Sequence, residues 1–162
     1  MSTKGDKAAP EHESEPRWKA PAFWALRLGL GALFVYAGAM KLGTPADFAT
    51  EIANYHLGNE LAPLMAVTMP TVEIVLGLGL IAGTRPWARA AALGAAALLA
   101  VFTVAVTTVV ARGINVDCGC FGGNSGPVTM VTVLRDVVLF LCAAAIFRLS
   151  TKSGAGPGPR EA

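Results

Sequence analysis

The chain has 162 residues and a formal net charge of +2 at pH 7, and it is 54% hydrophobic and only 15% charged. Its mean hydropathy of +0.54 lies well above that of a soluble globular domain of this size. A soluble fold is therefore excluded, and we expect membrane lipid rather than nucleic acid to surround most of the chain.

Four stretches are long and apolar enough to cross a bilayer as helices, which takes about 20 residues each. They cover residues 22–41, 61–83, 88–110 and 129–147. The sequence predicts an all-α membrane protein, a four-transmembrane-helix bundle in one domain over 22–149. The composition of the flanking segments, 1–21 and 150–162, predicts that they are disordered cytoplasmic tails. A cleaved signal peptide is the alternative for the first stretch, but the four acids that precede it argue against cleavage.

The orientation follows from the loop cations, because Lys and Arg stay on the cytoplasmic side. With the N-terminus inside, the outer loops hold only Lys41 and Arg112. The inner segments hold Lys4, Lys7, Arg17, Lys19, Arg85, Arg89, Arg148, Lys152 and Arg160. Both termini are therefore expected to be cytoplasmic in a bacterial inner membrane, with the loop at 111–128 facing the periplasm or exterior.

The first outer loop predicts a short amphipathic helix. Thr44, Pro45 and Asp47 form a typical helix start, and Phe48 and Tyr55 then share an apolar face together with Ile52. Such a helix lies on the outer membrane surface. Two roles stay open for it: a roof over a site in the bundle, or a simple interfacial anchor.

The loop between the third and fourth stretches contains the segment DCGCFGG at 117–123. Two cysteines at i and i+2 have Cα atoms at most about 7 Å apart, which overlaps the range of a disulfide. Gly119 removes a Cβ from the tight turn, and a strained, exposed disulfide is easily reduced. In an oxidising compartment the pattern predicts a redox-active pair, with Cys118 and Cys120 as the catalytic residues.

Two other uses of this pair remain open. One is a structural disulfide, and the other is Cu(I) ligation with His56, although a closed zinc site would need more ligands. We assign no metal site. Cys142 lies about 20 Å along the fourth helix from its outer end and is interpreted as a packing residue.

Ionisable residues inside the spans are functional candidates, because an unpaired charge in lipid is costly. Counting residues along the spans places Glu73 in depth between Arg27 and Arg135. One interpretation is a Glu–Arg pair that holds helices together. The other is a site for a quinone head group, with Glu73, Arg135, Arg27 and Lys41 as the binding residues.

The chain resembles the MauE/DoxX group of small bacterial membrane proteins over residues 22–148, and it is closer to the MauE side. The matching residues are Gly38, Lys41, Pro70, Glu73, Cys118, Cys120, Phe121, Gly122 and Arg135. MauE is implicated in maturing the disulfide-rich periplasmic methylamine dehydrogenase beside a thioredoxin-like partner, and DoxX relatives are linked to quinone reduction. Asp136 departs from the amide expected in MauE-like chains, which implies that it neutralises Arg135.

These inferences combine into one functional hypothesis. The chain is an integral membrane thiol–disulfide redox protein, interpreted as an oxidoreductase or a subunit of one. It exchanges disulfides with a periplasmic thioredoxin-like or client protein, and electrons pass to a membrane quinone, with no covalently bound cofactor. The alternatives are a non-catalytic assembly or maturation subunit that docks a periplasmic redox partner, and a carrier of Cu(I) or a small solute.

Overall fold

The structure is a computed structural model that describes residues 19–55, 59–114 and 126–152. Within these ranges the chain is entirely helical apart from short connections. The elements are α1 (Lys19–Gly43), α2 (Pro45–Asn54), the 3-10 helix η1 (Asn59–Leu61), α3 (Ala62–Ala82), α4 (Arg85–Ala111) and α5 (Met130–Lys152). The predicted all-α class is confirmed. Most of both predicted tails lies outside the described residues.

Four of the described helices are long and apolar enough to cross a membrane. These spans are Pro21–Gly43, Ala62–Ala82, Arg85–Ala111 and Met130–Thr151, and they agree with the four predicted spans to within a few residues at each end. Their outer faces carry large exposed side chains such as Val75, Val104 and Leu134. Apolar surface of this extent is what lipid requires of a helix bundle, and the chain is a multi-pass membrane protein.

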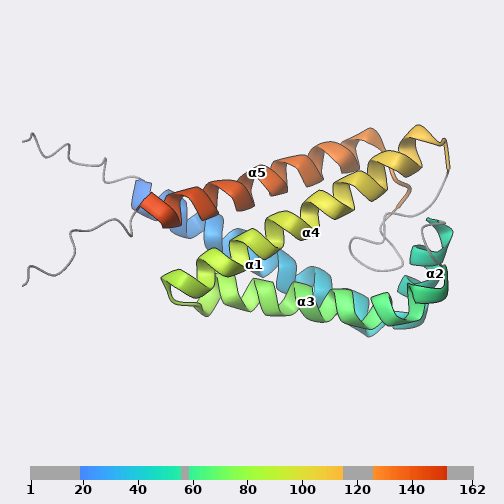
Figure 1. The fold of residues 1–162 in the computed structure, drawn as a ribbon, viewed down its shortest axis with the longest axis horizontal. Helices are drawn as coiled ribbons and strands as arrows, with labels where there is room; N and C mark the ends of the chain where they lie inside the picture. Colours follow the sequence, from blue (N-terminus) through green and yellow to red (C-terminus); the bar gives the residue numbers. More distant parts are fainter. Residues whose placement is uncertain (1–18, 56–58, 115–125, 153–162) are drawn as a thin grey trace, which may run out of the picture.

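The spans are arranged as two pairs, α1 with α3 and α4 with α5. Glycine permits the close approach of the first pair: a Cβ on Gly31 would lie 2.9 Å from Gly77 O, and one on Gly38 would lie 2.7 Å from Pro70 O. Small residues let membrane helices approach closely in this way. Figure 1 shows that the two pairs splay apart toward the end that carries α2. We call this the α2 end, and the opposite one, where α1 begins and α5 ends, the terminal end.

Helix α2 lies at the α2 end and packs mainly on α3. It begins at Pro45, where the missing N–H needs no helical partner. Phe48 and Glu51 are buried on it, and Tyr55, which directly follows the helix, is buried as well. The predicted short amphipathic helix is therefore confirmed, with one addition: its inward face carries the carboxylate of Glu51.

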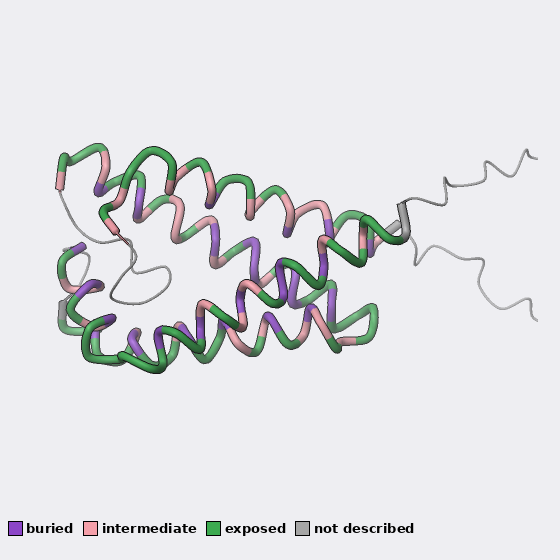
Figure 2. Tube along the Cα trace, turned by 180° about the vertical axis from the view of Figure 1, so that it is seen from behind, coloured by how far each residue is buried: buried purple, intermediate pink, exposed green. Residues whose placement is uncertain are grey.

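Two apolar clusters form the core of the described residues. The larger one packs the alanine-rich face of α4 against Leu30, Leu80 and Ile146. The smaller one, at the α2 end, joins Tyr55 to Val106 and Val109 of α4. Figure 2 shows the buried positions along the inward faces of the helices, with exposed positions outside them. Tyr55 thus connects the end of α2 to the second helix pair.

Candidate functional site

A buried ion pair joins α1 to α3 near the α2 end. Lys41, in the last turn of α1, donates from Nζ to Glu73 Oε1 at 2.5 Å, and the two side chains are only 2% and 8% exposed. The close approach at Gly38, described above, brings the two backbones near enough for this contact. A buried pair of this kind is stable only because each charge has the other.

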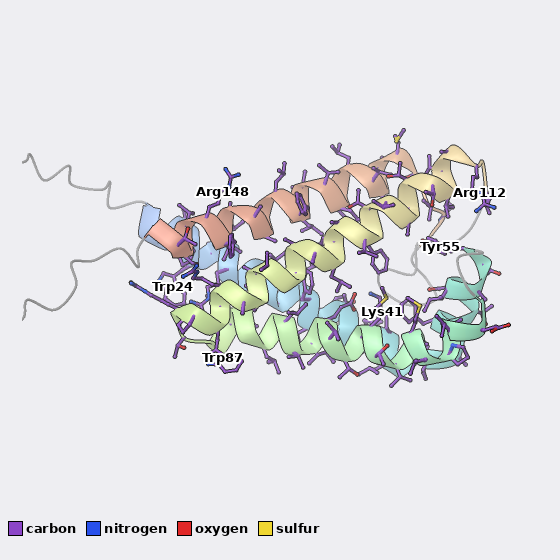
Figure 3. All side chains as sticks on the ribbon, viewed as in Figure 1. Trp24, Lys41, Tyr55, Trp87, Arg112 and Arg148 are labelled. Atoms are coloured by element: carbon purple, nitrogen blue, oxygen red, sulfur yellow. The ribbon has the colours of Figure 1, made fainter. Side chains whose placement is uncertain are left out.

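Two aromatic rings complete the surroundings of Lys41. Its Nζ lies 5.2 Å from the ring centroid of Phe48 on α2 and 5.3 Å from that of Phe102 on α4. An ammonium close to an aromatic ring is stabilised by the negative charge on the ring face. The side chain therefore links α1 to three other helices, and Figure 3 shows it between the two helix pairs. Because Phe48 contributes to this environment, α2 acts as a roof over the bundle interior at this end.

A second ion pair lies on α5. Arg135 donates from Nε and Nη2 to Asp136 Oδ1 at 3.1 and 2.9 Å. The Asp136 side chain is 4% exposed and that of Arg135 is 34% exposed. The neutralisation of Arg135 by its neighbour, which the sequence implied, is confirmed.

The two ion pairs border one cavity between the helix pairs. It has a volume of about 480 Å³, counting space that is open to the outside, and its polar lining consists of Lys41, Glu73, Arg135 and Asp136. The remaining lining is apolar: Leu33, Phe34, Ala37, Leu98, Leu99, Phe102 and Leu139. A mostly apolar wall with a few converging polar groups is typical of small-molecule sites.

Tyr55 and Glu51 extend the set of polar residues around the cavity toward the α2 end. Burial, together with the charges of Glu51 and Asp136, raises the pKa of Tyr55 to about 12, and the charge of Arg135 opposes this increase. Tyr55 is 8% exposed, so its hydroxyl stays protonated over the physiological range. The tyrosine lies at the border of the same charged region that lines the cavity (Figure 3).

Arg27 lies elsewhere, in the half of α1 nearer the terminal end. Its Nε donates to Leu80 O and its Nη2 to Gly83 O, and its guanidinium lies 4.8 Å from the ring centroid of Trp24. These carbonyls belong to the carboxyl end of α3, where backbone acceptors lack helical partners. Arg27 does not line the cavity, and it does not pair with Glu73.

The interpretation of Glu73 as the partner of an arginine is therefore wrong. Its partner is Lys41, while the carbonyl of Leu80 that holds Arg27 lies about 10 Å further along α3. The depth count from the sequence underestimated this separation, because it could not include the register that the α1–α3 contact sets. Glu51 was missed although it follows Phe48 by three residues, a spacing that places both on one helix face.

The predicted redox residues Cys118 and Cys120 lie outside the described residues, as does His56. In the part of the chain that the structure describes, no three His, Cys, Asp or Glu side chains come together as a metal site would require. Cys142 is a free, half-buried thiol on α5. Its interpretation as a packing residue stays a prediction.

Residues 19–149 match the model of the family described as methylamine utilisation protein MauE. The chain belongs to the MauE family. Its relatives include the methylamine utilization protein MauE of Paracoccus denitrificans, which is 41% identical over 126 residues, covering 76% of this chain and 67% of the relative. No solved structure matches the chain. The match to the MauE family contains the first three spans, all but the last two residues of the fourth, both ion pairs and the cavity.

Proposed function

We propose that this MauE-family protein is a membrane thiol–disulfide oxidoreductase of methylamine utilisation. In this proposal Cys118 and Cys120 oxidise the thiols of a periplasmic thioredoxin-like or client protein. The electrons then pass to a membrane quinone in the cavity bordered by Lys41, Glu73 and Arg135. The printed name of the Paracoccus denitrificans relative supports the assignment to methylamine utilisation.

The observation that carries the proposal is the position of the charged cavity. It lies toward the α2 end, where α4 ends and α5 begins (Figure 1), and the sequence between these two helices contains both cysteines. A lipid-soluble electron acceptor in this cavity would be held by polar groups at one side and by Phe34 and Leu98 at the other. No comparable set of charged residues lines the interior at the terminal end of the described helices, where Arg27 is bound to backbone carbonyls.

The chemistry balances as two exchanges. A thiolate of the partner attacks one sulfur of the Cys118–Cys120 disulfide, that S–S bond breaks, and the second partner thiolate resolves the mixed disulfide. The partner leaves oxidised, and the cysteine pair holds two electrons and two protons. The dithiol gives both to the quinone, which leaves as quinol, and the disulfide forms again.

The orientation in this proposal places the α2 end on the periplasmic side of the inner membrane and both termini in the cytoplasm. The distribution of arginines supports it. Arg85, Arg89 and Arg148 lie in the half of the bundle at the terminal end, whereas Arg112 follows α4 at the α2 end. Cationic residues remain preferentially on the cytoplasmic side.

The test uses the purified protein in lipid nanodiscs with decylubiquinone and a reduced thioredoxin-like protein as thiol donor. We expect quinol formation, measured by absorbance, to require both thiols, so that Cys118→Ser and Cys120→Ser abolish turnover. The matched control is Cys142→Ser, which removes a thiol far from the loop and should leave turnover unchanged.

Three results would each contradict a part of the proposal. If the double variant Cys118→Ser/Cys120→Ser supports methylamine-dependent growth as well as the original protein, the chain is a non-catalytic assembly subunit. If Cu(I) binds stoichiometrically, the same double change abolishes the binding, and no thiol oxidation occurs, the chain is a carrier. A cell-impermeant alkylating reagent that never labels the cysteines, even after reduction, would contradict the periplasmic orientation.

A further inference from the structure

The polar wall of the cavity contains hydrogen-bond acceptors that no described residue satisfies. Glu73 uses Oε1 to accept from Lys41, and Asp136 uses Oδ1 to accept from Arg135. The second oxygen of each carboxylate, Glu73 Oε2 and Asp136 Oδ2, is buried without a hydrogen-bond partner in the described structure. Both residues are more than nine-tenths buried, and both line the cavity. A buried acceptor without a donor is costly, so these two oxygens are suited to a ligand that donates.

Each cation beside these oxygens already has a carboxylate partner. Lys41 contacts Glu73 and lies against two aromatic rings, and Arg135 directs two nitrogens to a single oxygen of Asp136. The two pairs come from different helices, and each contributes to the cavity lining a carboxylate that has one unsatisfied oxygen. This chemistry favours hydroxyl groups over carbonyl oxygens, because two acceptors do not attract each other.

The rest of the cavity favours an apolar, lipid-borne molecule. Its walls are formed by leucine and phenylalanine side chains, and Leu33, Ala37 and Leu139 among them are only partly buried. They lie on α1 and α5, two helices that share few contacts. The cavity therefore reaches the outer surface of the bundle, which is the surface in contact with lipid, and a ligand with an apolar tail can extend along it.

We infer that the cavity binds the quinol form of a membrane quinone in preference to the quinone, through hydroxyl groups that donate to Glu73 Oε2 and Asp136 Oδ2. The choice of a quinol rests on the proposed function, because the structure itself specifies an apolar ligand with hydroxyl donors. Lys41 and Arg135 act as positioning residues in this arrangement, since each holds one carboxylate by its other oxygen.

The preference has a consequence for electron transfer. If the protein binds quinol more tightly than quinone, the bound quinone is a stronger oxidant than the free one. For a two-electron couple, each tenfold difference in dissociation constant raises the reduction potential by about 30 mV. The cavity would thereby favour electron flow from a dithiol to the quinone.

The experiment measures binding without thiol chemistry. The double variant Cys118→Ser/Cys120→Ser, in nanodiscs and without oxygen, is titrated by calorimetry with decylubiquinol, with decylubiquinone, and with the dimethyl ether of decylubiquinol. The ether keeps the size and tail of the quinol but has no hydroxyl donors. We expect the quinol to bind at least tenfold more tightly than either of the other two molecules.

Substitutions in the same background locate the preference. Asp136→Asn replaces an acceptor by an amide that also donates, and it should reduce the preference for quinol about tenfold. Asp47→Asn is the matched control, because Asp47 is exposed on α2, and it should leave all three dissociation constants unchanged. The comparison of quinol with its ether needs no change in the cavity, so it stays informative if Asp136→Asn does not fold.

The outcomes separate this inference from the proposed function. Equal affinity for all three molecules would overturn donor recognition by the two carboxylates and leave a quinone site in place. Absence of binding by any of them would overturn the cavity as a quinone site, while thiol exchange with a partner is decided by the cysteine variants above.

Discussion

The two ends of the bundle treat buried charge differently. At the terminal end, Arg27 is bound by the carbonyls of Leu80 and Gly83 and lies close to Trp24, and it does not line the cavity. At the α2 end, Lys41 and Glu73 form a pair that leaves a carboxylate oxygen buried without a donor. Both cations, Arg27 and Lys41, lie on α1. A charge that is satisfied by backbone carbonyls therefore holds two helices together. Charges whose pairing leaves some hydrogen-bond acceptors unsatisfied instead line a space that a ligand can occupy.

The largest effect is expected at the Lys41–Glu73 pair. Lys41→Met leaves the carboxylate of Glu73 buried without its partner, and loss of one member of a buried pair costs about 3–5 kcal/mol of stability. The double variant Lys41→Met/Glu73→Leu removes both charges and should recover most of this loss. Unfolding by SDS in mixed micelles measures the three free energies. A double variant as unstable as the single one would mean that the pair does not bind the helices through its charges.

A smaller loss is expected at the terminal end. Arg27→Met removes two hydrogen bonds from a charged donor, and we expect a net loss of about 1.5–3 kcal/mol, the value for one such bond, because neighbouring groups relax around the shorter side chain. It should lower the free energy of unfolding without altering the affinity for decylubiquinol, because Arg27 does not line the cavity. The control is Arg112→Met, an exposed arginine with little expected effect. Weakened quinol binding by Arg27→Met alone would break the distinction between the two ends.

The third prediction concerns the glycines that set the register of α1 on α3. A Cβ on Gly38 would lie 2.7 Å from Pro70 O and 2.8 Å from Ile74 Cγ1, so Gly38→Ala should push the helices apart and destabilise the bundle by about 1–3 kcal/mol. Gly29 has no atom within 4 Å of the same position, and Gly29→Ala should be neutral or stabilising by up to about 1 kcal/mol. The two melting temperatures in detergent give the comparison. Equal effects would show that close packing at Gly38 is not required.

The sequence predicted those parts of the molecule that depend on local pattern. The four spans followed from runs of apolar residues, and α2 followed from Pro45 and the spacing of Phe48 and Tyr55. The neighbouring charges of Arg135 and Asp136 also predicted their own pairing. Each of these needs information from one segment only.

The sequence could not predict contacts that depend on how helices are set against each other. Glu73 was expected near an arginine, yet the contact between Gly38 and Pro70 fixes a register in which Lys41 reaches it. The cavity itself results from the divergence of two helix pairs, which no single segment encodes. The roles of Cys118 and Cys120 remain predictions, because both residues lie outside the described structure.

The smallest effect at neutral pH is expected at Tyr55, which closes the charged region at the α2 end. Its pKa is raised to about 12 from an ordinary value of about 10, so the folded state holds the hydroxyl proton more tightly than the unfolded state. This contribution to stability is complete below about pH 10 and is lost as the pH rises toward 12.

The chain has two tyrosines, and absorbance of tyrosinate in the folded protein should show one that ionises late. Tyr55→Phe should remove that late component. Loss of the ionisation should itself have almost no effect on stability at pH 7, because the hydroxyl is protonated there in both the folded and the unfolded state. If the late component persisted in Tyr55→Phe, it would not come from Tyr55, and neither burial nor the charges of Glu51 and Asp136 would raise the pKa of that residue.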